Sequence, residues 1–118
     1  MANYMLLIFG DAQQWAAMTP EQAQAHDAAH EAFIAAAGSQ IVGGGALEPA
    51  PVATTLRSDG GDGIIITDGP FLETKEAVGG YYLLEASDLD EVMKLASLLP
   101  EVRASHSAVE IRPAVDHE

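Results

Sequence analysis

Residues 4–38, YMLLIFGDAQQWAAMTPEQAQAHDAAHEAFIAAAG, place a strand and a helix in succession, and this pair begins the fold. Residues 4–9 are rich in strand-forming side chains and stop at a Gly-Asp turn signal. Residues 19–22 (TPEQ) supply a capping hydroxyl, a first-turn proline and an acceptor three residues after the cap, which together predict a helix start. Gly38 is expected to end that helix.

The rest of the chain is predicted to supply further strands and a second helix. Short extended runs, separated by glycine-, proline- and aspartate-rich turns, suit an antiparallel meander. We expect strands at residues 41–47, 52–57, 63–67, 81–85 and 108–112. Residues 88–91 (DLDE) have the composition of a helix start, and Pro100 is expected to end the second helix.

This order of elements predicts an α+β fold. Strand, helix, strands, strand, helix, strand is the pattern of a ferredoxin-like split β-α-β sandwich, with an antiparallel sheet and both helices on one face. The uncovered face of such a sheet needs a partner, and a second copy buries both open faces at once. We therefore predict a homodimer, in the form of a dimeric α+β barrel.

Length, composition and charge limit the kinds of protein that this chain can be. With 118 residues, the chain is expected to form a single domain over residues 1–113, followed by a flexible tail at 114–118. There is no cysteine, no segment resembling a signal peptide and no long apolar run, so we predict a cytoplasmic protein without membrane contact. A formal net charge of −13, with only five lysines and arginines, argues against direct nucleic-acid binding.

Two histidines lie on the apolar stripe of the first predicted helix. Two interpretations of His30 remain open. It is either a buried neutral imidazole or a general acid/base, since histidine commonly has that catalytic role near neutral pH. His26 is four residues away on the same face, a spacing that can hold a metal, but the sequence assigns no third ligand. We therefore predict neither a metal nor a cofactor.

Other candidate site residues lie in the polar second half of the chain. Asp68 follows an apolar strand and precedes Gly-Pro, so it either holds a tight turn or accepts a proton. Arg57 and Lys75 are two of the few cations; they either bind an anionic substrate together with Glu73 or only balance neighbouring acids. Tyr81 and the next tyrosine face opposite sides of a strand, and Tyr81 is predicted to contact substrate.

Residues 67–76 (TDGPFLETKE), followed by 79–82 (GGYY), resemble the DGPF signature of the YCII-related family. Residues 5–8, 43–44, 88–91 and 109–113 extend the resemblance along almost the whole chain. It implies the same dimeric fold and an enzyme whose substrate is unknown.

The resemblance also implies roles for particular residues. His30 matches a family histidine that pairs with an aspartate just beyond the second helix. That helix ends here in residues 98–100 (LLP), without the aspartate, so Asp68 is the candidate carboxylate. Some relatives accompany or are fused to sigma factors, which implies a sigma-factor association and a regulatory role.

Two functions remain open from the sequence. In the first, the protein is a lyase or isomerase for a small molecule, in which His30 moves a proton, Asp68 orients it, and Lys75 or Arg57 holds an anionic substrate. In the second, it is a non-catalytic ligand-sensing or interaction module linked to sigma-factor regulation. The sequence does not choose between them.

Overall fold

The computed structural model describes residues 1–115 of the chain. Its main elements are β1 (Ala2–Asp11), α1 (Ala12–Ala16), α2 (Pro20–Ala37), β2 (Ile41–Ala46), β3 (Thr54–Ser58), β4 (Ile64–Asp68), β5 (Glu76–Ala86), α3 (Leu89–Ala96) and β6 (Ser107–Pro113). Three 3-10 turns join them: η1 (Gly38–Gln40), η2 (Ala50–Val52) and η3 (Pro100–Val102). Residues 116–118 of the expected tail lie outside the described residues.

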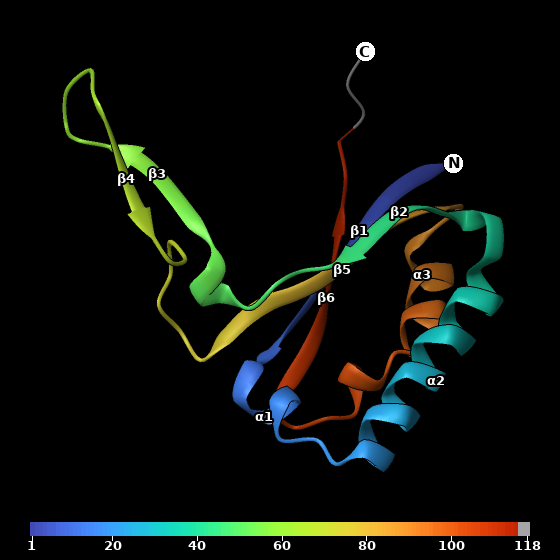
Figure 1. The fold of residues 1–118 in the computed structure, drawn as a ribbon. Helices are drawn as coiled ribbons and strands as arrows, with labels where there is room; N and C mark the ends of the chain where they lie inside the picture. The colour runs from blue at the N-terminus through green and yellow to red at the C-terminus, as the bar shows by residue number, and fades with distance from the viewer. Residues whose placement is uncertain (116–118) are drawn as a thin grey trace.

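The fold is built on a four-stranded antiparallel sheet in the order β2-β5-β1-β6. Within this sheet the chain runs strand, helix, strand, strand, helix, strand, and α2 and α3 lie against one face (Figure 1). The predicted α+β class and antiparallel sheet are therefore confirmed. The dimeric barrel stays a prediction.

Local signals in the sequence explain where the helices begin. The Thr19 hydroxyl accepts the backbone N–H of Gln22, and the Gln22 side chain accepts the backbone N–H of Thr19, which forms the predicted capping box. Asp88 caps α3 with a single hydrogen bond, because its side chain accepts the backbone N–H of Glu91. However, α3 ends at Ala96, four residues earlier than Pro100 would require.

The core lies between the sheet and the two helices. Its largest fully buried side chains come from every layer of the fold: Leu6, Phe33, Leu84, Val92 and Leu99. In β1 the buried residues alternate with half-buried ones, as expected for a strand with one face on the core. This packing holds α2 across the sheet and so positions the histidines that α2 carries.

The β3–β4 hairpin departs from the predicted meander. It is a separate two-stranded sheet that projects from the body of the molecule (Figure 1), and all five residues of β4 are exposed. The segment between β2 and β3 contains Pro49 and Pro51, which lack the backbone donor that a central strand needs. The meander is therefore interrupted, and β2 pairs with β5 instead of β3.

The sheet face opposite the helices has an apolar centre, beside which β6 contributes the charged residues Glu110 and Arg112. Cross-strand pairs Met5–Leu83 and Leu7–Tyr81 lie on it, and all four side chains are only half-buried. The thinnest dimension of the chain is 20 Å, about the depth of one sheet and one layer of helices. Among the described residues, no helix has both the length and the apolar character needed to cross a bilayer.

Candidate functional site

Three elements bring four polar side chains together between α2 and the sheet. His26 and His30 are one turn apart on α2 and therefore share a face. Glu101 lies in η3, the next element along the chain after α3, and only 3% of it is exposed. Tyr82 stands on the helix side of β5, and its ring packs against Phe33 in the core.

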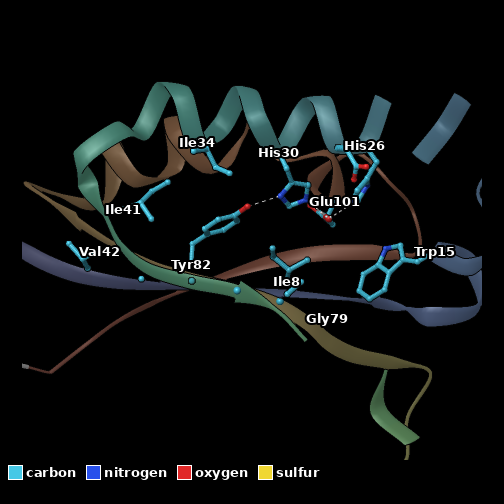
Figure 2. Close-up of a pocket in the computed structure, with 16 residues that line it drawn as sticks. Ile8, Trp15, His26, His30, Ile34, Ile41, Val42, Gly79, Tyr82 and Glu101 are labelled. Carbon is cyan, nitrogen blue, oxygen red and sulfur yellow. Dashed lines mark hydrogen bonds and ion pairs between the residues drawn. The ribbon is translucent and has the colours of Figure 1, made fainter. Parts of the chain in front are cut away.

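Two hydrogen bonds and one ion-pair contact join the four side chains in a continuous set (Figure 2). His30 Nε2 lies 2.8 Å from Glu101 Oε2, and His26 Nε2 lies 3.1 Å from the same oxygen. On the other side of the ring, His30 Nδ1 lies 2.8 Å from the Tyr82 hydroxyl. Because an ionised carboxylate only accepts, a neutral His30 carries its proton on Nε2 and accepts the Tyr82 O–H at Nδ1.

The cluster determines the charge of two of its members. Burial by itself raises the pKa of Glu101, but the hydrogen bond from His30 and the positive charge that His30 and His26 can carry outweigh it, so the pKa lies below its usual range. Burial, followed by the negative charge of Glu101, raises the pKa of Tyr82. Near neutral pH, Glu101 is therefore ionised and Tyr82 is a neutral phenol.

A cavity of about 780 Å³ opens beside this cluster. Figure 2 shows Trp15 on one side of the polar residues, and Ile34, Ile41 and Val42 on the other. Below them β2 and β5 contribute mostly glycine, so little side-chain volume fills the space over these strands. The glycines and the alanine that line the cavity are Gly43, Gly44, Gly45, Ala46, Gly79 and Gly80.

The Trp15 wall is held firmly in place. Its indole N–H donates to the Ser107 hydroxyl at 3.1 Å. The ring lies over Gly10 and Gly79, where an added Cβ would come within 2.3 and 2.4 Å of ring atoms, respectively. Glycine at these two positions is therefore what allows the indole to form one wall of the cavity.

Chemically, the cluster can move protons or bind a cation. His30 has an acceptor on one side and a hydroxyl on the other, the arrangement of an oriented general acid/base. His26, His30 and Glu101 also place one possible ligand atom each within 4.8 Å of one another, and two imidazoles with a carboxylate could hold a divalent metal. Glu101 thus supplies the third ligand that the sequence left unassigned.

Of the predicted catalytic pair, only His30 lies at this cavity. Asp68 is the last residue of β4, where it pairs with Thr54 in the projecting hairpin. Both ring nitrogens of His30 are already hydrogen-bonded, to Glu101 and to Tyr82. Within the described chain the carboxylate beside His30 is therefore Glu101, and the expected approach of Asp68 is not seen.

The predicted substrate-binding residues lie elsewhere as well. Arg57 is in β3, with its guanidinium 5.2 Å from the centre of the Phe71 ring. Glu73 and Lys75 are exposed in the segment between β4 and β5. Tyr81 points to the face of β5 opposite the cavity, since its neighbour in the strand points into it. None of these four predicted residues lines the cavity of the single chain.

Sequence reasoning missed Glu101, although a signal for it was present. The resemblance placed an acidic partner just beyond the second helix, and Glu101 directly follows residues 98–100 (LLP). A glutamate carries the same carboxylate as an aspartate on a side chain that is one methylene group longer. Tyr82 was recognised only as a neighbour of Tyr81, because the sequence does not show which of the two faces the helices.

Comparison with known proteins places the chain in a family. The model of the YCII-related domain matches residues 2–115. "Uncharacterized protein R00369" from Rhizobium meliloti (strain 1021) is 42% identical over 67 residues, which are 57% of this chain and 53% of that protein. The matched part is about half the length of that relative, and its name assigns no activity. Because the family model covers nearly the whole described chain, this protein belongs to the YCII-related family.

Proposed function

We propose that the protein is a lyase or isomerase that moves a proton on a small molecule bound in the cavity. The observation that carries this proposal is His30, hydrogen-bonded between an ionised carboxylate and a neutral hydroxyl beside a cavity of about 780 Å³. His30 is the acid/base, and Glu101 orients it and balances the charge of its imidazolium form. Glu101 thereby takes the role that the sequence had suggested for Asp68.

The hydrogen bonds indicate a path for the proton. Tyr82 passes its hydroxyl proton to His30 Nδ1 while its oxygen accepts the proton that leaves the substrate. The imidazolium that forms is stabilised by Glu101, 2.8 Å away. Return of the proton to another substrate atom completes an isomerisation, and its delivery to a leaving group completes an elimination.

The test is NMR of the ionisable side chains, which requires no substrate. Because His30 lowers the pKa of Glu101, His30→Ala should raise the pH at which the Glu101 carboxyl carbon titrates. The ring nitrogen shifts of neutral His30 should report the tautomer protonated at Nε2, and these shifts should change in Glu101→Gln. Asp68→Asn is the matched control and should change neither signal.

Two results would overturn the proton-transfer proposal. One is a Glu101 titration that is the same with and without His30, since the pair would then not be coupled. The other is stoichiometric bound metal in the purified protein that is lost in Glu101→Gln, because His30 Nε2 would then be a ligand and not a proton carrier.

We further propose that two copies pair as a homodimer. The apolar centre of the open sheet face supports this proposal, since α2 and α3 cover only the other face (Figure 1). The hairpin supports it too: Leu56, Ile64 and Ile66 are each more than 60% exposed, and an isolated two-stranded hairpin is marginal in water. An isologous pair would cover both surfaces in both copies.

The alternative function, a non-catalytic sensing or interaction module, is favoured by the segment that ends the hairpin and follows it. Residues 67–76 support assignment to the DGPF branch of the family, for which a sigma-factor association is proposed. Phe71 and Leu72 of this segment are 65% and 68% exposed and could contact such a protein. Binding of purified protein to a purified sigma factor, abolished by Phe71→Ser but not by Glu101→Gln, would support the module; no binding would count against it.

A further inference from the structure

The charges around the cavity bear on what it can accept. No lysine or arginine of the described chain lines it, whereas two acidic residues, Asp27 and Glu101, do. An anionic group brought into this space would lose water and find carboxylates without a permanent cation to compensate. The chain as a whole carries a formal charge of −13, which adds to this repulsion.

The other walls of the cavity are apolar. Trp15 forms one side and Ile34, Ile41 and Val42 the other, with Ile8 and the glycine-rich strands below (Figure 2). Apolar walls with a few convergent polar groups are typical of sites for small organic molecules. The polar groups gather under α2. Both ring nitrogens of His30 are hydrogen-bonded there, and Tyr82 donates its proton to His30, so the Tyr82 oxygen can accept a further hydrogen bond.

From this distribution we propose that the cavity binds an uncharged small molecule with a mainly apolar body and one hydrogen-bond donor directed at the Tyr82 oxygen. Carboxylates and phosphates are disfavoured, contrary to the anionic substrate that the sequence suggested. The inference rests on the proposed function for the location of the site, but it requires no proton transfer.

Two fluorescent probes that share one ring system provide the test. N-phenyl-1-naphthylamine is uncharged, and 8-anilino-1-naphthalenesulfonate adds a single sulfonate to the same rings. The chain has one tryptophan, and it forms a wall of the cavity, so energy transfer from Trp15 reports that a probe is bound, and the variants below locate it. At pH 7.5 we expect the uncharged probe to bind at least tenfold more tightly than the sulfonate.

Two pairs of proteins assign the binding to the cavity. Ile34 lines the cavity and is 47% exposed. Ile34→Phe places a larger side chain in the cavity wall, so it should weaken binding of the uncharged probe about fivefold or more. The matched control is Leu89→Phe on α3, where the leucine is 45% exposed and does not line the cavity; it should leave binding unchanged. Glu101→Gln removes a buried negative charge and should narrow the gap between the two probes relative to the wild-type protein.

The outcomes separate this inference from the proposed function. The binding inference is overturned if the sulfonate binds as tightly as the uncharged probe or more tightly. It is also overturned if the uncharged probe does not bind, or if Ile34→Phe leaves the affinity of that probe unchanged. If the probes behave as expected while Glu101 titrates independently of His30, the binding inference stands and proton transfer fails. If the titration of Glu101 depends on His30 but the sulfonate binds more tightly, the proton-transfer proposal stands and the binding inference fails.

Discussion

The substitution His30→Ala tests the energetics of the buried cluster most directly. It removes the 2.8 Å hydrogen bonds to Glu101 and to Tyr82 and leaves His26, at 3.1 Å, as the remaining side-chain partner of the carboxylate. Removing one partner of a buried pair costs about 3–5 kcal/mol, because the other charge stays buried without compensation. The side chain of His30 is still 20% exposed and borders an open cavity, so we expect a loss of about 3 kcal/mol in the free energy of unfolding.

Urea unfolding at pH 7 measures this loss, and a second substitution tests its cause. If the buried charge is responsible, adding Glu101→Gln to His30→Ala should restore about 1–2 kcal/mol, because a neutral amide is less costly to bury than an unpaired carboxylate. A double variant no more stable than His30→Ala would refute this reasoning. The loss would then come from packing and not from the charge of Glu101.

The same cluster predicts how stability depends on pH. The pKa of Glu101 is lower in the folded chain than its unfolded value of about 4.3. A carboxyl group of this kind contributes stability that is fully present above its unfolded pKa and is lost as the pH falls through its folded pKa. The stability advantage of the wild-type protein over Glu101→Gln should therefore decline as the pH falls below about pH 4.

Three further substitutions test the packing and the proposed assembly. Gly79→Ala places a Cβ 2.4 Å from the single tryptophan, so it should lower the free energy of unfolding by about 1–3 kcal/mol and shift the indole emission. Gly61→Ala is the control: its Cβ meets nothing closer than 3.5 Å, and it should change neither quantity. Leu6→Ala empties a fully buried core position and should cost about 2–5 kcal/mol in urea unfolding. Ile66→Lys should convert a dimer to monomers in analytical ultracentrifugation without loss of helix signal, and Val115→Lys should not; a wild-type monomer at all concentrations would refute the dimer.

Much of the fold could be predicted because its signals are local. The capping box at Thr19, the cap at Asp88 and the apolar runs of the strands each depend on a few neighbouring residues, and the elements begin close to where those residues predict. The sheet face opposite the helices also follows from alternation along β1. The projecting β3–β4 hairpin could not be predicted, since strand-like composition does not say which strands pair.

The candidate site illustrates the same limit. The sequence by itself determined the α+β class, and it placed His26 and His30 on one helix face, because both depend on periodicity along the chain. Only the tertiary structure decided that Glu101, 71 residues beyond His30, supplies the carboxylate, and that Tyr82 rather than Tyr81 faces it. The physical reason is that a hydrogen bond across 71 residues depends on how α2, η3 and β5 pack around one core, and no local pattern encodes that distance.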